Sequence, residues 1–473
     1  MARDLLRVDY VLPDPRPGEK GSRRKAPVPS VTMALLLAQT PARINGIPVE
    51  ASVHVESAAG PYDVAARRPD MLCFSMLTTG ALRAYEISRQ ARDCRSQSGG
   101  RIAIVMGGIH PTALPLEAMQ YADAVVCGET PPELQVEVLT WAAGNLDKKP
   151  EPRAFELTGP RPEVLVRPCP DFSWMRPRDY MVPQALQTGV GCPYNCSFCT
   201  ATRIFGARMR PVAYDLIERD VAALGPGLVT IVDDNFLAHK PYEHARKVCE
   251  IMGRHGRRWV AELTARDLWS DPELIPLFSS SGCYGVYTGI ESVRQKLPKG
   301  LHPHEYKDLV ARCHDNGMLV LGAFVFGVGD DEDEGIFEET ISFTEKIALD
   351  FAQFSVNTPE PGSSDFERAV RQNLIIDWNW EHYDGGHPVR TFNNMSVERM
   401  YQGLRDAYRW FYSLGSMRRR LWPLGSWRQA RVWPYNLYLS GTVRLWLRRT
   451  DPAQERARAV PAPDPAVLRT FAQ

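Results

Sequence analysis

Short apolar runs alternate with amphipathic stretches of helical length through most of this chain. In residues 1–150 three runs are apolar enough to form buried strands, at residues 71–76 (MLCFSM), 102–106 (IAIVM) and 123–127 (DAVVC). Helical patterns separate these runs, as they do when parallel strands are joined by crossover helices. The pattern predicts an N-terminal, doubly wound α/β domain.

A second α/β series follows in residues 181–365. Its expected strands lie at residues 185–190, 228–233, 259–263, 285–290, 320–326 and 351–358. Helical stretches between them predict parallel strands. Six such units indicate a partial (β/α)6 barrel, although a doubly wound sheet would have the same pattern.

Two further segments differ in composition from these α/β series. Residues 151–180 are rich in proline and charge, which indicates a linker. Residues 366–473 are rich in Trp, Tyr and Arg at helical spacing, which predicts a C-terminal, mostly helical domain.

Length, charge and cysteine content limit the classes of protein to which this chain can belong. A chain of 473 residues predicts two or three domains. Its 56 basic and 56 acidic residues balance, so we expect no nucleic-acid partner. No apolar run approaches the ~20 residues that span a bilayer, and the early run at residues 31–38 lacks the features of a secretory signal. Ten cysteines in so long a chain favour a reducing, cytoplasmic location with metal use over a disulfide framework.

Three of the cysteines stand close together in the sequence. Cys192, Cys196 and Cys199 follow the expected strand at residues 185–190 in a C-x3-C-x2-C pattern. Thiolates are soft ligands, suited to zinc or to iron–sulfur centres. Three thiolates on one loop can hold three corners of a cubane cluster and leave the fourth iron open to a small molecule.

A zinc site is the alternative for these cysteines. Structural zinc needs a fourth protein ligand. No histidine occurs between Asp171 and Ala238, and the remaining cysteines show no paired spacing. We therefore expect an iron–sulfur cluster.

On this triplet, residues 180–365 resemble the radical S-adenosylmethionine (SAM) superfamily. The resemblance implies that the open iron of a 4Fe–4S cluster chelates SAM. Reductive cleavage then gives a 5′-deoxyadenosyl radical that takes a hydrogen atom from the substrate. It also implies an external reductant such as flavodoxin or ferredoxin. The aromatic Phe198, one residue before the last cysteine, fits the family.

Polar residues at later strand ends extend this resemblance. In the family such positions contact SAM, and here they are occupied by Asp233, Asp234, Asn235, Glu291, Ser292 and Gly327. Asp and Asn at a strand end are also ordinary turn and helix-cap residues, which is the alternative for residues 233–235.

The N-terminal domain contains a Gly-Gly turn between an expected strand and a helix. Two adjacent glycines allow backbone to approach a bulky ligand, and a helix N-terminus favours phosphate. With the neighbouring strand ends, this turn resembles the cobalamin-binding domain that precedes the barrel in cobalamin-dependent radical SAM enzymes. The resemblance implies cobalamin contacts from Ser75, Leu77, Gly107, Gly108, Thr112, Gly128 and Glu129. A domain that has lost cobalamin is the alternative.

One feature of the wider cobalamin-binding fold is missing. None of the ten histidines has Asp two residues before it, as an Asp-x-His-x-x-Gly loop requires. His110, directly after the Gly-Gly pair, stands in the wrong place for a lower cobalt ligand. We expect cobalamin to bind base-off without a histidine ligand, with the loop at residues 75–79 facing the lower side of cobalt.

The C-terminal segment is unusually basic and aromatic. Residues 410–449 contain five Trp and eight Arg but no Asp or Glu. Such a segment suits peripheral contact with an anionic membrane, for example at the inner membrane face. A helical cap with tryptophans in a core is the alternative, and His387 and Tyr383 just before it are expected to be structural.

These features together indicate a cobalamin-dependent radical SAM methyltransferase. Its substrate would be a natural product, lipid or tetrapyrrole-like molecule methylated at an unactivated carbon. Ring formation or rearrangement with the same cofactors is the second hypothesis. A methylthiotransferase and a non-enzymatic cobalamin or cluster sensor fit less of the sequence.

Overall fold

The N-terminal sheet has seven strands in the order β2-β3-β1-β4-β5-β6-β7. In this computed structural model they are β1 (Leu6–Leu12), β2 (Arg43–Ile44), β3 (Ile47–Val55), β4 (Met71–Ser75), β5 (Ala103–Gly107), β6 (Ala124–Cys127) and β7 (Arg153–Glu156). All neighbouring pairs are parallel except β2 with β3. The structure describes residues 3–15, 26–238, 240–294, 297, 299–329, 331–421, 427–449, 460, 462–463 and 468.

Helices cover both faces of this sheet. Leu72 and Phe74 of β4 point into one core, whereas Met71 and Cys73 point into the other. The first core includes residues of α4 (Ala81–Asp93), α5 (Ile109–Ala113) and α6 (Pro115–Ala118), and the second includes residues of α1 (Val31–Ala38) and α7 (Pro132–Ala143). The predicted doubly wound domain is confirmed. The short helices α2 (Glu56–Ala59), α3 (Val64–Arg67) and η1 (Thr78–Gly80) lie in its connections.

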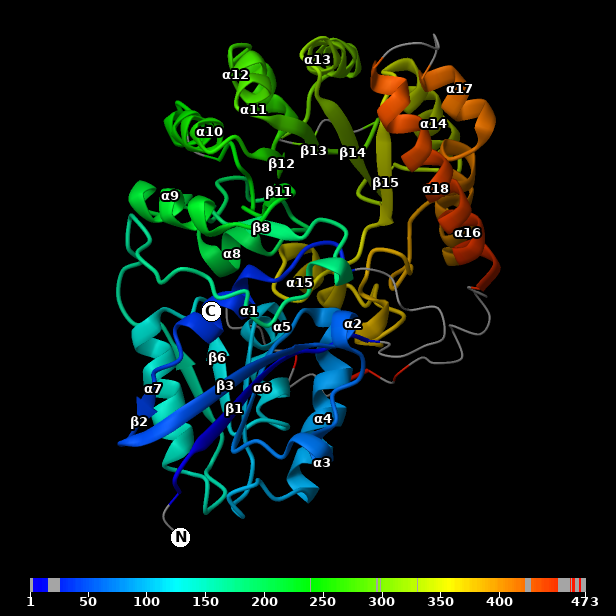
Figure 1. The fold of residues 1–473 in the computed structure, drawn as a ribbon. Coiled ribbons are helices and arrows are strands. Elements are labelled where there is room, and N and C mark those ends of the chain that lie inside the picture. Colours follow the sequence, from blue (N-terminus) through cyan, green and yellow to red (C-terminus); the bar gives the residue numbers. More distant parts are fainter. Residues whose placement is uncertain are drawn as a thin grey trace.

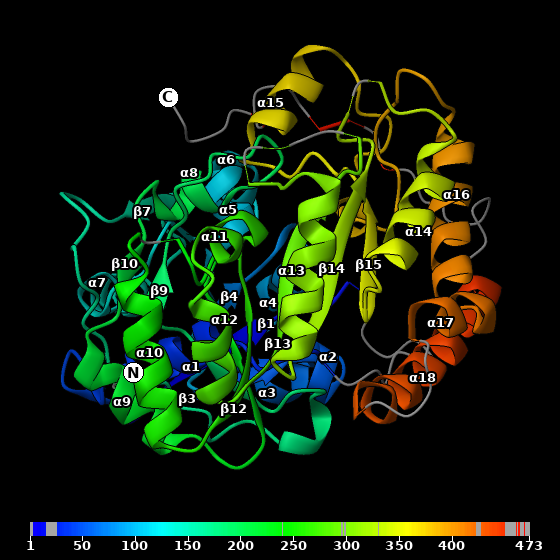
Figure 2. The ribbon, with the colours of Figure 1, turned by 90° about the horizontal axis from the view of Figure 1, so that it is seen from above.

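The second sheet has six parallel strands that neighbour one another in chain order. They are β8 (Gln184–Leu186), β11 (Leu228–Ile231), β12 (Arg258–Glu262), β13 (Cys283–Glu291), β14 (Leu319–Phe326) and β15 (Phe351–Val356). Crossover helices line the outside of the curved sheet in Figures 1 and 2. These are α9 (Tyr214–Ala223), α10 (Glu243–Arg254), α11 (Ala265–Ser270), α12 (Leu274–Ser280), α13 (Pro303–Asp315) and α14 (Ile336–Lys346). The partial (β/α)6 barrel is confirmed.

Two boundaries differ from the sequence expectation. Strand β7 lies inside the expected linker and pairs with β6, so the first sheet extends past residue 150. The expected strand at residues 185–190 divides into β8 and β9 (Gly189–Val190), and β9 pairs antiparallel with β10 (Arg210–Pro211). This break lets the chain leave the sheet just before the cysteine triplet, which α8 (Ala201–Phe205) follows. The 3-10 turn η2 (Pro177–Asp179) lies before β8.

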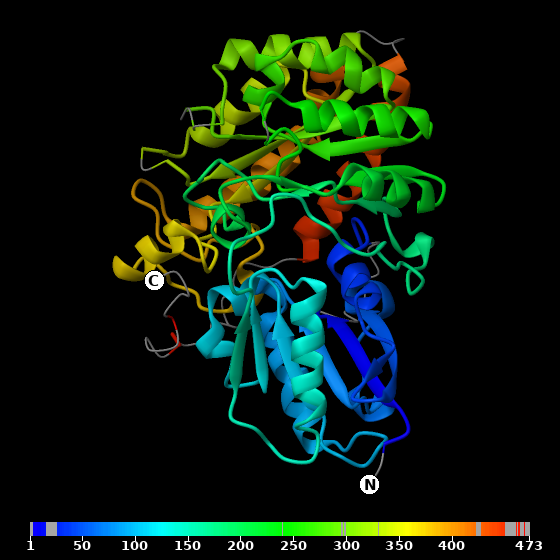
Figure 3. The ribbon, with the colours of Figure 1, turned by 90° about the vertical axis from the view of Figure 1, so that its left-hand side faces the viewer.

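The segment expected as one C-terminal helical domain packs on two different cores. Phe366 of α15 (Ser364–Arg371) and Trp380 of η3 (Trp380–His382) lie in the core of the N-terminal domain. In contrast, α16 (Val397–Phe411) contributes Met400 and Leu404 to the barrel core. Helices α17 (Leu414–Leu421) and α18 (Trp427–Arg449) continue along the barrel (Figure 3). In the part of the chain that the structure describes, no helix is both long and apolar enough to cross a membrane.

Candidate active site between the barrel and the N-terminal domain

The cysteine triplet occupies the loop between β9 and α8. Cys192 is buried, while Cys196 and Cys199 are half-buried. The loop is held by its own backbone: the Cys196 amide donates to the Tyr194 carbonyl (2.8 Å), and the Cys199 amide donates to the Cys196 carbonyl (3.2 Å). The Thr202 hydroxyl donates to the Cys192 carbonyl (2.9 Å), which joins the loop to α8.

The chemistry of the three thiols fits a metal cluster. Burial raises the pKa of Cys192 to about 11, and repulsion from the other two thiols adds to this. Burial also raises the pKa values of Cys196 and Cys199, but the Lys299 ammonium opposes that rise. Binding of a metal would displace the thiol protons. Among the described residues, no group of three His, Cys, Asp or Glu side chains is placed to hold a metal ion.

All three polar residues after β11 accept hydrogen bonds from backbone amides. Both carboxylate oxygens of Asp233 accept hydrogen bonds from Thr188, one from its amide (2.7 Å) and one from its hydroxyl. The Asn235 side-chain oxygen accepts from the Thr264 amide (3.2 Å). The geometry therefore favours the turn-forming alternative for Asp233, whereas the buried Asn235 side-chain nitrogen has no hydrogen-bond partner among the described residues. Asp234 accepts from the Gly191 amide (2.8 Å), just before Cys192, and so fixes the start of the cysteine loop.

A charged group lies at the mouth of the barrel, beside this loop. The Lys299 ammonium pairs with Glu291 at 2.6 Å and lies 5.6 Å from the centre of the Phe198 ring. Glu291 has a positive φ of 67° at the end of β13, and its side chain is buried. Lys299 and Glu262 were not identified from the sequence. Glu262 is the last residue of β12 and lies near the end of the strand predicted at residues 259–263, which is a signal that could have found it. Lys299 lies in a turn without a pattern.

The Glu262 carboxyl has no hydrogen bond or ion pair within the described part of the chain. Solvent reaches the side chain, yet the surrounding protein raises its pKa from 4.5 to about 7 by burial. Lys299 opposes this rise, and the Glu291 and Asp234 carboxylates add to it. Perturbed carboxyls in a cleft are typical of functional sites.

Substitution of this carboxyl should change the pH dependence of stability. Between pH 4.5 and about 7 the folded protein keeps a proton on Glu262 that the unfolded chain releases, so stability falls as pH rises through that window. Glu262→Gln removes this fall. We expect it to be more stable than the wild type by about 1 kcal/mol at pH 8, after allowance for solvent screening, and equally stable at pH 4. Chemical unfolding at both pH values measures this, with the exposed Glu338→Gln as control; equal pH profiles for wild type and Glu262→Gln would contradict the assignment.

The remaining strand-end residues expected to contact SAM are engaged with protein. The Ser292 hydroxyl donates to Glu332 (3.1 Å), and the Gly327 amide donates to the same carboxylate (2.6 Å). Gly327 has φ 83°, and an added Cβ would stand 2.5 Å from the Phe392 ring. The protein side of Gly327 is therefore filled by Phe392, and its amide is already used by Glu332.

The expected cobalamin contacts lie at the carboxyl ends of β4, β5 and β6. Ser75 and Gly107 are paired across β4 and β5. The Ser75 hydroxyl makes no hydrogen bond to any described residue, and the Leu77 side chain is 55% exposed. The Thr112 hydroxyl donates to the Gly108 carbonyl (2.7 Å) and accepts from the Gly128 amide (2.8 Å). A free hydroxyl, an exposed apolar side chain and backbone polar groups fit the edge of a large cofactor.

Gly108 has a structural role that the sequence did not indicate. Its φ is 100°, and an added Cβ would stand 2.6 Å from both the amide nitrogen and the carbonyl oxygen of Met76. The backbone after β4 packs against this turn. Gly107 differs, since the nearest atoms to an added Cβ lie 3.7 Å away.

Glu129 and His110 have protein partners. Glu129 was expected near cobalamin, but it forms an ion pair with Arg210 of β10 and a longer one with Arg161 (3.7 Å). It thereby ties the N-terminal domain to the barrel. His110 is fully buried, with Nε2 3.2 Å from the Tyr85 hydroxyl, so it is not a free cobalt ligand.

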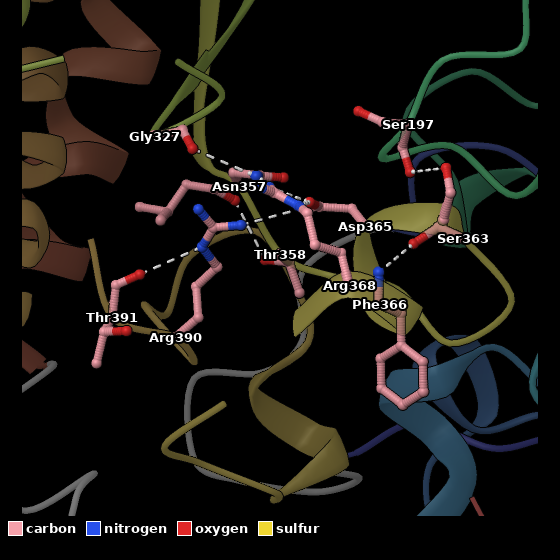
Figure 4. Close-up of polar contacts among 12 residues, drawn as sticks. Ser197, Gly327, Asn357, Thr358, Ser363, Asp365, Phe366, Arg368, Arg390 and Thr391 are labelled. Carbon is pink, nitrogen blue, oxygen red and sulfur yellow. Dashed lines mark hydrogen bonds and ion pairs between the residues drawn. The ribbon is translucent and has the colours of Figure 1, made fainter. Parts of the chain in front are cut away.

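The loop between β15 and α15 joins the two halves of the site. An added Cβ on Gly362 would stand 3.1 Å from Ala113 of the N-terminal domain and 3.8 Å from Thr200, next to the cysteine loop. Burial raises the pKa of Glu360 to about 7, and the nearby Thr78 side chain at the start of η1 opposes the rise. Figure 4 shows the polar contacts that continue from this loop into α15.

Comparison with known proteins agrees with this geometry. A sequence model of the radical SAM superfamily matches residues 186–344, and a model of the B12 binding domain matches residues 48–135. An uncharacterized methyltransferase of Pyrococcus horikoshii is 28% identical over 371 residues, covering 73% of this chain and 79% of that protein. Bacteriochlorophyllide d C-12(1)-methyltransferase of Chlorobaculum tepidum is 26% identical over 367 residues, covering 74% and 76%.

A solved structure shares the whole fold. Radical S-adenosylmethionine methyltransferase TsrM from Kitasatospora setae, with cobalamin and a 4Fe–4S cluster bound, aligns with a TM-score of 0.57 at 15% identity. The alignment covers 97% of this chain and 91% of that one.

Fold and site thus define a two-domain α/β protein in which a B12-binding domain faces a radical SAM barrel. A B12-binding domain followed by a radical SAM domain is the organisation of cobalamin-dependent radical SAM enzymes, and these two domains imply a 4Fe–4S cluster, SAM and cobalamin as cofactors.

Proposed function

We propose that this protein is a C-methyltransferase that methylates an unactivated carbon of a natural product, lipid or tetrapyrrole-like substrate. The observation that carries the proposal is the meeting of two sites at one junction. The two sites are the cysteine loop and the carboxyl ends of β4–β6. The β15–α15 loop lies between them, because Gly362 is close to Ala113 of α5, which follows β5, and to Thr200, which follows the cysteine loop. The methyltransferase relatives named above support the same reaction class.

The residues that would hold the cofactors follow from their positions. Cys192, Cys196 and Cys199 would ligate the cluster, Asp234 and Glu291 would lie closest to SAM, and the backbone of Gly327 would border its far end. Ser75, Leu77, Thr112 and Gly128 would line the cobalamin site. When bound, the cluster with SAM supplies a radical that takes a hydrogen atom from the substrate, and cobalamin supplies the methyl group.

The chain itself would orient the reactants and exclude water. Asp234 keeps the Gly191 amide, and therefore the start of the cysteine loop, in place. The Lys299–Glu291 pair presents a balanced charge at the barrel mouth, while Glu262 offers a carboxyl that is near its pKa at neutral pH. Such a carboxyl can accept a hydrogen bond from a substrate hydroxyl or amine.

The deciding experiment is anaerobic incubation of reconstituted protein with candidate substrates, methyl-labelled SAM, cobalamin and a reductant such as flavodoxin or dithionite. We expect labelled product, with S-adenosylhomocysteine and 5′-deoxyadenosine formed in step with it. Formation of deoxyadenosine without S-adenosylhomocysteine would contradict methyl transfer and favour ring formation or rearrangement.

The state of bound cobalamin gives an independent prediction. We expect cobalamin to be bound base-off without a histidine ligand, because no Asp-x-His-x-x-Gly loop is present and His110 is buried against Tyr85. EPR of the cob(II)alamin form should lack nitrogen superhyperfine splitting. Splitting from a bound imidazole or benzimidazole would contradict it.

We further propose peripheral contact of α18 with anionic membranes. Tyr435 and Tyr438 are 61% and 65% exposed, and no acidic residue occurs in residues 410–449. Of the five tryptophans there, Trp422 and the side chain of Trp427 lie outside the described residues, as do the Arg448 and Arg449 side chains. Co-sedimentation with phosphatidylglycerol vesicles should fall about tenfold in Tyr438→Asp. Equal binding to neutral vesicles, or none by the wild type, would contradict the proposal.

A further inference from the structure

The residue after β15 ties the ends of two barrel strands together. The Asn357 amide donates to the Phe326 carbonyl (2.8 Å), and its side-chain nitrogen donates to the Gly327 carbonyl (3.3 Å). Both acceptors lie at the end of β14, where the backbone borders the proposed SAM site. Asn357 is only 3% exposed, so these bonds are shielded from water (Figure 4).

The same side chain reaches Asp365 in the first turn of α15. Asn357 Nδ2 donates to Asp365 Oδ2 at 2.9 Å, and Arg390 Nη1 lies 3.3 Å from that oxygen. The other oxygen, Oδ1, pairs with Arg368. Asp365 is 2% exposed, and every one of these contacts is drawn in Figure 4. A carboxylate buried so fully with charged and neutral donors has a single orientation.

The backbone at this turn holds the cysteine loop. The Asp365 amide donates to the Ser197 carbonyl (2.8 Å), and the Ser364 hydroxyl donates to the same oxygen (3.2 Å). Ser197 lies between Cys196 and Cys199 on the exposed side of the loop. Two donors from a distant part of the chain thus converge on one carbonyl among the expected cluster ligands.

The turn is itself anchored on the N-terminal domain. The Ser363 hydroxyl caps α15 by accepting from the Phe366 amide (3.1 Å). Phe366 and Ala369 are buried in the core that also contains Ala113 and Leu114. A shift of this turn would therefore move the cysteine loop relative to both β14 and the expected cobalamin site.

We propose that Asp365 is a positioning residue for the cluster. Its carboxylate fixes the first turn of α15, and its backbone amide holds the Ser197 carbonyl. The cysteine loop is thereby kept in place relative to the end of β14. The inference rests on the proposed function, because it concerns SAM bound between the cluster and the end of β14. Asp365 would set the position of the cysteine loop relative to that strand end. Asp365 touches neither reactant nor cofactor, and acts through Ser197 and Asn357.

Asp365→Asn tests this, because it keeps the shape of the side chain and removes the charge that Arg368 and Arg390 share. A matched control is Asp220→Asn in α9. Asp220 is 4% exposed and is paired with Arg167 (2.8 Å) and Arg219 (2.7 Å), in a helix on the outside of the barrel. Both variants should lose stability to a similar extent, since each leaves one buried guanidinium, that of Arg390 or Arg167, with less counter-charge.

The readout is a SAM titration of the reduced, reconstituted cluster followed by EPR. We expect Asp365→Asn to need about tenfold more SAM than the wild type for the same spectral change, equivalent to about 1.4 kcal/mol of binding. Hydrogen exchange of residues 192–205 in the protein without cluster should be faster in this variant. Ser364→Ala, which removes only the hydroxyl donor to Ser197, should shift the titration two- to threefold. Asp220→Asn should leave both readouts at wild-type values.

The outcomes separate this inference from the proposed function. If the wild type takes up no iron, the proposed function fails and the inference fails with it. If the wild type binds a cluster and SAM but Asp365→Asn titrates like Asp220→Asn, the proposed function stands and the positioning role is overturned. Should Asp365→Asn fail to fold, Ser364→Ala decides: a wild-type titration overturns the inference.

Discussion

Protein carrying Cys196→Ala is expected to form no detectable 5′-deoxyadenosine. With one of three thiolate ligands gone, two cluster corners remain held by protein, and a cubane ligated in that way is labile. Reconstituted wild type should bind about four irons per chain, whereas the variant should bind far fewer. Anaerobic iron and sulfide assays, reduced EPR spectra with and without SAM, and chromatography of nucleoside products measure these effects.

Cys94→Ala is the matched control for that variant. Cys94 is also half-buried, but it lies at the end of α4 in the N-terminal domain. It should keep wild-type iron content and deoxyadenosine formation. Retention of a SAM-responsive cluster by Cys196→Ala would remove Cys196 from the ligand set. A wild type that binds one zinc per chain and no iron would favour the zinc alternative for the whole triplet.

Strand prediction succeeded where a strand is apolar throughout. Central strands of a parallel sheet bury both faces, so β4, β5 and β6 appear as continuous hydrophobic runs. Strand β1 was missed because it contains Arg7 and Asp9, although Asp9 is buried and accepts from Tyr62 and Arg67. Strand β3 was missed because it is half-buried along most of its length and includes Pro48. A strand is hard to recognise in the sequence when it contains polar residues whose hydrogen-bond partners lie far away in the chain.

The cysteine loop was predictable because its ligands lie within eight residues of one another. The groups that position it were not, because they depend on contacts between distant segments. Ser197 is held by Asp365, and the domains are tied by Glu129 and Arg210. An aspartate after a Ser-Ser pair and an isolated arginine have no local pattern. The same limit explains why Asp233 was expected at the ligand and is instead used by Thr188.

Gly108→Ala should remove cobalamin from the protein, whereas Gly107→Ala should leave it bound. At Gly108 the backbone has φ 100°, and the new Cβ would stand 2.6 Å from two backbone atoms of Met76. Residues other than glycine are strained in this region by about 1–3 kcal/mol, and the clash adds to that. The turn after β5 would move, and with it Thr112 and the Gly128 amide that it holds. At Gly107 the nearest atoms are 3.7 Å away, so Ala is accommodated.

The two variants separate methyl transfer from radical formation. Gly108→Ala should bind cobalamin at least about tenfold more weakly and give no methylated product, because the strain falls on the cofactor site. It should still take up iron and form deoxyadenosine slowly, since the cysteine loop belongs to the barrel. Absorption spectra of reconstituted protein report cobalamin, and mass spectrometry with labelled SAM reports product. Wild-type methylation by Gly108→Ala would show that cobalamin is not the methyl donor. Equal loss of cobalamin in Gly107→Ala would mean that the ligand contacts Gly107 directly, because that substitution strains no backbone.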